Sequence, residues 1–177
     1  MKGCNKKLLF FFRKEGAEGE GVYISSLKMN LEGKAICSWP DGDSYVGEFK
    51  NGEKHGHGIY IFSDGSEYEG EWKNGLKNGR GLFIFDNGEK YEGEFRNDMP
   101  DGYGVYTEPE GGIYKGEWKE GLKHGQGSYT FPDRSVYIGE FKKDKPWNVR
   151  SYDSHGNISA KWVKGKKRNG RSTSHFT

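Results

Sequence analysis

Hydrophobic and polar residues alternate in short segments of this chain, and one such segment recurs every 23 residues. In residues 68–72, Tyr68, Gly70 and Trp72 would lie on one side of a β-strand, and Glu69 and Glu71 on the other. The pattern predicts strands with one ring-bearing face and one charged face. It begins at five positions: Tyr45, Tyr68, Tyr91, Tyr114 and Tyr137.

Each repeat continues into a second predicted strand. Asn74-Gly75 is a typical two-residue hairpin turn. Beyond it, Gly79, Gly81 and Phe83 share one parity, so we expect both glycines on the face that carries the rings. Without side chains, they leave room there for rings from the neighbouring strand to lie flat.

The fold that follows is all-β. A two-stranded hairpin is marginal alone, so successive hairpins must pack side by side. We predict an elongated single-layer antiparallel β-meander of about five to six 23-residue hairpin repeats, roughly 50–60 Å long. The expected divisions are an N-terminal segment (1–21), a degenerate capping repeat (22–44), the repeat array (45–144), a degenerate C-terminal repeat (145–165) and a basic, disordered tail (166–177).

Three substitutions interrupt the pattern. Asp98 and Asp144 stand where other repeats have the turn glycine, and Arg134 replaces the glycine that closes the fourth repeat. Because these glycines would adopt positive φ, we expect the turns at the three positions to differ from the others.

The repeated residues resemble the MORN repeat, the membrane occupation and recognition nexus motif. The family pattern is Tyr-x-Gly-x-aromatic-x-x-Gly, then Gly-x-Gly-x-aromatic, then Asp-Gly. The match covers 45–144 well and about 22–165 loosely. The resemblance implies an elongated meander, and roles in phospholipid contact, protein scaffolding or self-association.

Composition supports a folded protein. The chain has 29 glycines among 177 residues and 27 aromatic residues (5 Trp, 11 Tyr and 11 Phe), whereas disordered chains are poor in aromatics. The apolar run from Leu8 to Phe12 is shorter than the ~7–15 residues of a signal-peptide core. Two cysteines, Cys4 and Cys37, are too few for a disulfide scaffold, although a single disulfide between them is an alternative to the reduced state. We expect a reduced, cytoplasmic protein, with membrane association as an alternative.

The charge distribution bears on a membrane role. Residues 45–136 carry 11 basic and 17 acidic side chains, whereas 137–177 carry 10 and 3. An anionic membrane would therefore repel the repeats and attract the tail, at ~1 kcal/mol per charge. The candidate lipid contacts are Lys161, Lys164, Lys166, Lys167, Arg168 and Arg171.

No pattern indicates catalysis, a metal or a cofactor. His55 and His57 could supply two metal ligands, but a closed zinc site needs four. A glutamate recurs in every repeat (Glu48, Glu71, Glu94, Glu117 and Glu140), followed two residues later by Lys or Arg. We expect a solvated ladder of charges worth little per pair. The sequence thus predicts neither an enzyme nor a small-molecule substrate.

The predicted function is a non-enzymatic scaffold that presents its aromatic ribbon to a protein partner or a second copy. The alternative is a peripheral module that binds anionic phospholipid, mainly through the tail. Nucleic acid is disfavoured as a partner because aromatic side chains do not interleave the basic cluster beyond Trp162. The candidate packed or partner-facing aromatics are Tyr45, Phe49, Tyr60, Tyr68, Trp72, Phe83, Tyr91, Phe95, Tyr106, Tyr114, Trp118, Tyr129, Tyr137 and Phe141.

Overall fold

The computed structural model describes residues 8–9 and 32–169, and its regular elements there are all β-strands. These residues form two compact units, one from the described part of residues 1–88 with 94–99, and the other from residues 89–93 with the described part of 100–177. The first unit holds β1 (Leu8–Leu9), β2 (Gly33–Ser38), β3 (Ser44–Lys50), β4 (Glu53–Ile61), β5 (Glu67–Lys73) and β6 (Leu76–Ile84). The second holds β9 (Ile113–Lys119), β10 (Leu122–Thr130), β11 (Val136–Lys142), β12 (Lys145–Tyr152), β13 (Ile158–Val163) and β14 (Lys166–Asn169). Both units contribute to β7 (Lys90–Arg96) and β8 (Met99–Thr107).

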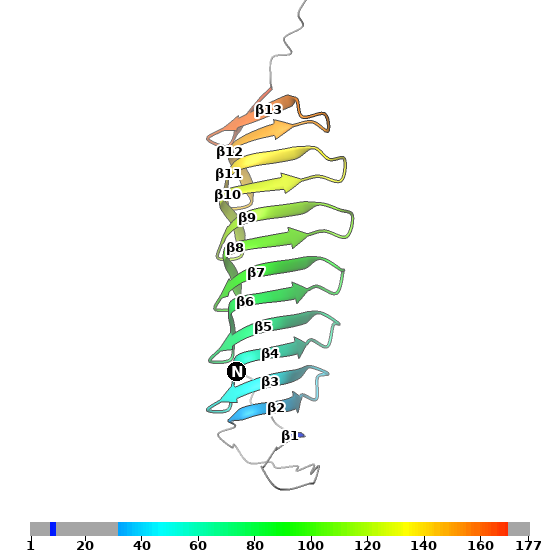
Figure 1. The fold of residues 1–177 in the computed structure, drawn as a ribbon, viewed down its shortest axis with the longest axis vertical. Helices are drawn as coiled ribbons and strands as arrows, with labels where there is room; N and C mark the ends of the chain where they lie inside the picture. Colours follow the sequence, from blue (N-terminus) through cyan, green and yellow to red (C-terminus); the bar gives the residue numbers. More distant parts are fainter. Residues whose placement is uncertain (1–7, 10–31, 170–177) are drawn as a thin grey trace, which may run out of the picture. The chain divides into compact units, whose positions relative to one another are not determined.

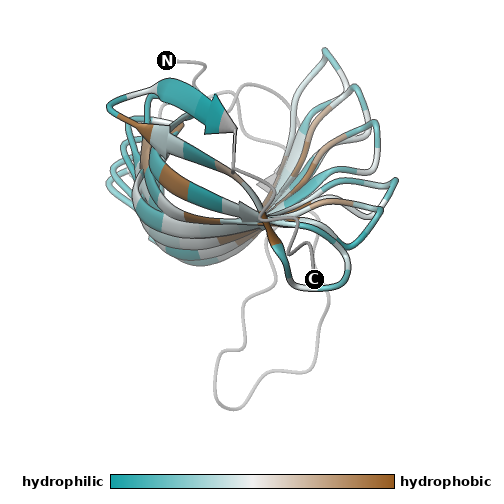
Figure 2. Cartoon of the chain, turned by 90° about the horizontal axis from the view of Figure 1, so that it is seen from above, coloured by the Kyte–Doolittle hydropathy of each residue, from teal (hydrophilic) through white to brown (hydrophobic). Residues whose placement is uncertain are grey.

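Within each unit, strands pair antiparallel in the order in which they occur in the sequence (Figure 1). Two-residue turns alternate with five-residue connections such as 62–66 and 131–135. Seen from above, the strands are bent and the longer connections project away from them (Figure 2). The predicted all-β meander of 23-residue hairpin repeats is confirmed.

The tight turns all adopt the same conformation, including those without glycine. Asn74 and Gly75 have φ of 51° and 79°, and Asn97 and Asp98 have 49° and 71°. The Asp98 carboxylate accepts a hydrogen bond from the Lys77 backbone N–H at 2.9 Å, which offsets the strain of positive φ. Asp144 makes the same bond to Lys123 at 2.8 Å. The prediction that these two turns would differ is therefore wrong.

Arg134 likewise adopts the conformation of the glycine it replaces. Its φ is 68°, and its N–H donates to the Phe131 carbonyl at 2.9 Å. Gly65 makes the equivalent bond to Phe62 at 3.0 Å. The connection between the fourth and fifth repeats thus keeps the form of the others, contrary to expectation.

A β-bulge changes the expected position of the first Gly-x-Gly glycine. Gly70 pairs with Gly81 and Trp72 with Lys77, so Glu71 alone faces residues 78–80. Gly79 has φ of 84°, and a Cβ there would lie 2.6 Å from the Glu71 carboxyl carbon. Gly79 therefore faces the glutamate rather than the rings, and the strict alternation predicted for β6 is wrong at this point.

The recurring glutamates are more than a solvated ladder. Glu71 Oε1 accepts a hydrogen bond from the Arg80 backbone N–H at 2.9 Å, and Glu117 Oε1 accepts one from Gln126 at 2.8 Å. Each carboxylate thus satisfies a backbone donor that the bulge leaves without a ladder partner.

Replacing Glu71 with alanine is therefore expected to cost about 1.5 kcal/mol, the lower end for a hydrogen bond to a charged group, because the site is partly exposed. Glu69→Ala is the matched control: Glu69 is exposed two residues earlier in β5, and its loss should cost under about 0.5 kcal/mol. Urea unfolding measures both. Equal costs for the two variants would contradict the role assigned to Glu71.

The two ends depart from expectation in different ways. Cys37, fully buried in β2, is disulfide-bonded, so the structure does not show the reduced state that we expected. Cys4 lies outside the described residues. At the other end, Lys166–Asn169 form β14, paired with β13, so this part of the tail is not disordered.

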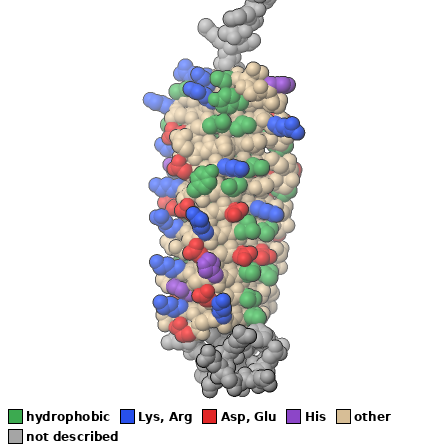
Figure 3. Space-filling model, viewed as in Figure 1, with side chains coloured by type: hydrophobic (Ala, Val, Ile, Leu, Met, Phe, Trp, Pro, Cys, Tyr) green, Lys and Arg blue, Asp and Glu red, His purple; other side chains and the backbone are tan. Residues whose placement is uncertain are grey.

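On the face drawn in Figure 3, Lys and Arg side chains gather along the edge that has the tight turns.

Candidate functional site

The tyrosine that begins each repeat has a structural position. Tyr45 and Tyr68 are completely buried. A Cβ placed on Gly70 or Gly81 would meet the Tyr68 hydroxyl at 2.6 and 2.5 Å, so the ring lies flat across this cross-strand glycine pair. Its hydroxyl donates to the Glu71 carbonyl at 3.0 Å. These tyrosines are not available to a partner.

The second aromatic of the pattern is also buried, with Trp72 4% exposed. Phe95 meets Tyr68 edge-on at 5.0 Å, and Phe141 meets Tyr114 at 5.2 Å. Of the predicted aromatics, the buried set is Tyr45, Phe49, Tyr60, Tyr68, Trp72, Tyr91, Phe95, Tyr114, Trp118 and Phe141. The half-buried set is Phe83, Tyr106, Tyr129 and Tyr137.

A partly exposed series of rings lies on the same face, and we call it the aromatic stripe. In the first unit it comprises Phe62, Phe83 and Phe85, with successive ring centroids 5.6 and 4.5 Å apart. In the second unit Phe131 contacts Tyr129 at 4.5 Å and Tyr137 at 4.7 Å; Trp162 extends the series. Three of these residues were not among the candidate aromatics, although they recur seventeen positions after the lead tyrosine and Phe85 has the parity of Phe83: Phe62, Phe85 and Phe131.

Lysine ammonium groups lie against the rings. Lys54 Nζ is 4.0 Å from the centroids of Tyr60 and Trp72, well within cation–π range. Lys77 is 4.5 Å from Phe83, and Lys123 is 4.8 Å from Tyr129. The sequence prediction missed these lysines, although they share a signal, since each follows a lead tyrosine by nine residues.

In each unit, a carboxylate accepts a hydrogen bond from one of the tyrosines. Tyr60 Oη donates to Asp43 Oδ2 at 2.6 Å, and Tyr129 Oη donates to Glu108 Oε2 at 2.7 Å. Burial is the main reason that the pKa of Tyr129 rises to about 12, and the Glu108 hydrogen bond adds to it. The ring-bearing face of each unit therefore combines aromatic rings, half-buried lysines and hydrogen-bonded carboxylates.

Burial lowers the pKa of Lys54 to about 8, against the opposing effect of Asp98 and Asp43, and it lowers the pKa of Lys77 as well. Because the lysine pKa in an unfolded chain is about 10.4, the unfolded state binds more protons above pH 8, and stability should rise with pH there. The buried tyrosines, whose pKa values are raised, reverse this trend above about pH 10.

The free energy of unfolding should therefore increase between about pH 7.5 and 9.5. Urea unfolding at both pH values tests this, with Lys54→Met as the comparison. The variant should show a smaller increase than the natural chain. An identical pH dependence in the two proteins would show that Lys54 does not titrate in this range.

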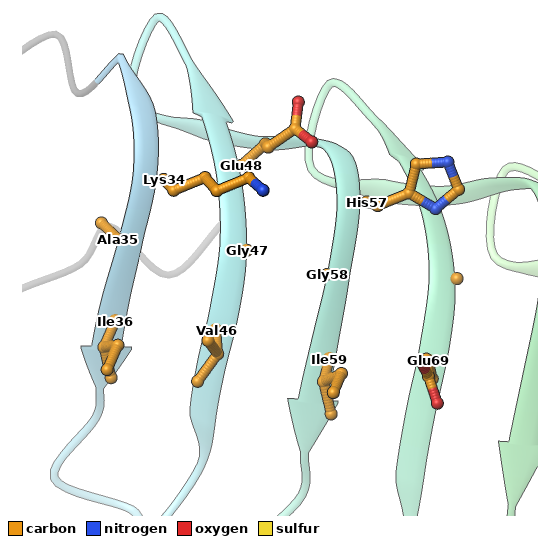
Figure 4. Close-up of a pocket in the computed structure, with 11 residues that line it drawn as sticks. Lys34, Ala35, Ile36, Val46, Gly47, Glu48, His57, Gly58, Ile59 and Glu69 are labelled. Carbon is orange, nitrogen blue, oxygen red and sulfur yellow. The ribbon is translucent and has the colours of Figure 1, made fainter.

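The opposite face of the first unit carries aliphatic residues. Ile36, Val46 and Ile59 lie side by side on β2, β3 and β4, with Glu69 next to them on β5 (Figure 4). They line an open depression of about 400 Å³, with Lys34 and His57 near its margin. It contains no triad of nucleophile, base and orienting group.

The basic cluster is divided between the two faces of a hairpin. Lys161 pairs with Arg168, and Trp162 pairs with Lys167, whose ammonium lies 5.4 Å from the indole ring. Neighbouring residues of a strand point to opposite faces, so Lys167 and Arg168 are separated. The five cluster residues that the structure describes are exposed, and Arg171 lies outside the described residues.

Metal-binding clusters and membrane-spanning helices are both absent from the described part of the chain. Residues 8–9 and 32–169 contain no group of three or more His, Cys, Asp or Glu side chains that could hold a metal ion. The same residues include no helix with the length and apolar character needed to cross a membrane.

Similarity to solved structures is distant. The TCP domain of Drosophila melanogaster SAS-4 (dCPAP), solved in complex with a proline-rich motif of Ana2 (dSTIL), is 13% identical; the alignment covers 81% of this chain and 87% of that one, with a TM-score of 0.49. The G-box domain of the microcephaly protein CPAP is 14% identical over 80% of this chain and 100% of that one, with a TM-score of 0.41. No curated protein matches.

The repeats themselves match a family model. The MORN repeat model matches six consecutive segments: residues 23–44, 45–67, 68–90, 91–113, 114–136 and 137–148. The first of these falls where we expected a degenerate capping repeat. The matched segments span most of the chain and agree in phase with the hairpins described above. This protein therefore belongs to the MORN repeat family.

Proposed function

We propose that this chain is a non-enzymatic interaction module that binds a protein partner, or a second copy of itself, through the aromatic stripe. The observation that carries the proposal is the partial exposure of rings that contact one another in series, such as Phe62, Phe83 and Phe85. Exposed contiguous apolar surface of this kind is typical of protein interaction sites.

The chemistry of the face supports a protein ligand. Aromatic residues are enriched at protein interfaces because each ring buries a large area while restricting few torsion angles. Here the rings are preorganised, since Phe83 contacts both Phe62 and Phe85, and Lys77 lies 4.5 Å from its centroid. A partner would therefore meet a surface that loses little conformational entropy on binding.

The test is a pull-down from native lysate with the full chain as bait. Phe62→Ala and Phe131→Ala remove one ring of the stripe in each unit. Val46→Ala and Ile138→Ala are the controls, because these side chains are 48% and 51% exposed and precede Gly47 and Gly139, one position out of phase with the rings. We expect the two control variants to capture a protein that the two stripe variants no longer capture. If the proteins associate with themselves instead, analytical sedimentation should show self-association in the control variants and not in the stripe variants. Capture of the same proteins by all four variants, with no difference in self-association, would contradict the proposal.

A second candidate function is binding to anionic phospholipid through the β13–β14 hairpin, favoured by its five exposed basic side chains. Co-sedimentation with phosphatidylserine vesicles tests it. The double variant Lys161→Glu, Arg168→Glu reverses the charge of one cross-strand pair and leaves the rest of β14 in place. This variant should no longer bind the vesicles. High salt should act likewise, since the Debye length falls from ~10 Å at 0.1 M to ~3 Å at 1 M. Salt-insensitive binding by the double variant would contradict this function.

A further inference from the structure

Three rings of the first unit stand in equivalent positions of successive hairpins. Trp39, Phe62 and Phe85 are 23 residues apart, and all three are partly exposed. Each begins one of the longer connections, and its carbonyl accepts a hydrogen bond from the backbone N–H three residues later, at 3.1, 3.0 and 3.0 Å respectively. The three connections therefore place their rings in the same way.

Two intervening rings join them into a regular series, which we call the ring array. Tyr60 contacts Trp39 and Phe62, with ring centroids 5.5 and 4.5 Å apart. Phe83 contacts Phe62 and Phe85 in the same way, at 5.6 and 4.5 Å. Because equivalent residues of neighbouring hairpins are separated by two strand spacings of ~4.8 Å, the array has a period of about 9.6 Å.

This period discriminates among the regular conformations that a peptide ligand can adopt across the strands. A polyproline II helix advances ~9.3 Å per turn of three residues, so every third residue would meet the next ring with a mismatch of only ~0.3 Å. In an extended strand, residues on one face are ~6.7 Å apart, so the middle ring would be missed by ~3 Å. An α-helix repeats every ~10.5 Å and would be ~2 Å out of step at the third ring. The spacing therefore favours polyproline II.

Lysines already cover the two intervening rings. Lys54 and Lys77 lie over Tyr60 and Phe83, with Nζ 4.0 and 4.5 Å from the respective centroids. Lys77 is farther, 5.8 Å, from the centroid of Phe62. The ligand contacts are therefore assigned to the three partly exposed rings that begin the connections.

The connections that carry these three rings are acidic. Residues 39–43, 62–66 and 85–88 include no basic side chain and four acidic ones: Asp41, Asp43, Asp64 and Asp86. All but Asp43 are exposed. A ligand that places arginine or lysine between its prolines would be attracted to this edge of the unit.

We propose that the ring array binds a proline-rich, basic segment of the partner in the polyproline II conformation, with one proline on each of Trp39, Phe62 and Phe85. The site rests on the proposed interaction function, whereas the ligand class rests on this chain's own ring spacing and charge. An aromatic surface suits such a ligand, because a polyproline II helix is ordered before binding and loses little conformational entropy.

The test measures the binding of labelled seven-residue peptides to the full chain by fluorescence anisotropy. The first probe has proline at every third position, beginning with the first, and arginine before the second and third prolines, with alanine elsewhere. The control probe has the same composition with the prolines two residues apart, the spacing that suits an extended strand. We expect saturable binding of the first probe and at least about tenfold weaker binding of the control, a difference of ~1.4 kcal/mol.

Two variants locate the binding. Phe62→Ala removes the central ring and should weaken binding of the first probe at least about tenfold. Ile61→Ala is the matched control and should leave binding unchanged, because Ile61 is 45% exposed and precedes Phe62, out of phase with the rings. Urea midpoints show whether both variants are folded.

Asp64→Asn tests the charge without a change to the rings. It keeps a side-chain oxygen that can accept the Ser66 N–H, a bond of 2.8 Å in the natural chain. It should weaken binding about two- to fivefold, the range for an exposed ion pair. No saturable binding, equal affinity for the two probes, or unchanged affinity in Phe62→Ala would overturn the proposal.

These outcomes are separable from those of the proposed function. If a protein is captured through the stripe but the first probe does not bind, the interaction function holds and the proline-rich ligand is refuted. If the first probe binds and Phe62→Ala loses it, but no protein and no second copy binds through the stripe, the peptide site holds and its assignment to a partner is refuted.

Discussion

Replacing Trp72 with alanine is expected to lower the free energy of unfolding by about 3–5 kcal/mol, the usual cost of removing a buried ring of this size. Trp72 is 4% exposed, contacts Tyr45 and Tyr68 edge-on at 5.4 and 5.0 Å, and lies under the Lys54 ammonium. Its Nε1–H also donates to the Gly58 carbonyl at 3.1 Å. One substitution thus removes contacts to strands of two hairpins.

Phe83→Ala is the comparison, because this ring is on the same face but half-buried. The sequence alone suggests similar costs for the two rings, whereas the structure predicts a clearly smaller cost for Phe83, since less area returns to water. Urea unfolding of both variants decides the matter. A cost for Phe83→Ala that equals or exceeds that of Trp72→Ala would contradict the division into buried rings and aromatic stripe.

Introducing valine at Gly81 is expected to destabilise the protein by a similar amount. A Cβ at Gly81 would lie 2.5 Å from the Tyr68 hydroxyl and 2.6 Å from its ring carbons. The ring must therefore leave its site, and the cost approaches the ~3–5 kcal/mol of losing a buried aromatic. The higher β-propensity of valine offsets at most about 1 kcal/mol of this.

A double-mutant cycle isolates the contact. If the Tyr68 ring causes the clash, Gly81→Val should cost little more once Tyr68 has been replaced by alanine, so the two effects should be strongly non-additive. Thermal or urea unfolding of the two single variants and the double variant supplies the numbers. Additive costs would mean that the ring does not lie across Gly81.

Much of the fold could be predicted because each repeat carries complete local signals. The alternation in residues 68–72 specifies a strand, and Asn74-Gly75 specifies the turn that follows. The Asp98 turn could not be predicted from one repeat, because the hydrogen bond that stabilises its positive φ comes from Lys77 in the preceding hairpin. The bulge at Gly79 was missed for a related reason, since the residues there do not show how one strand pairs with the next.

Less of the candidate site than of the fold could be predicted from the sequence. A ring-bearing face could be predicted, but alternation alone does not separate the buried Trp72 from the half-buried Phe83. The embedded lysines were missed because a lysine in a strand suggests a solvated charge. Lys54 instead packs its ammonium against Tyr60 and Trp72, a position set by the packing of neighbouring hairpins.

The central claim is that a protein ligand covers the aromatic stripe, and hydroxyl-radical footprinting of the captured complex tests it most directly. We predict that Phe62, Phe83 and Phe131 become less reactive in the complex than in the free chain. Val46 and Ile138, exposed and out of phase with the rings, should keep their reactivity. Protection of the two aliphatic residues, with the stripe as reactive as before, would contradict the account.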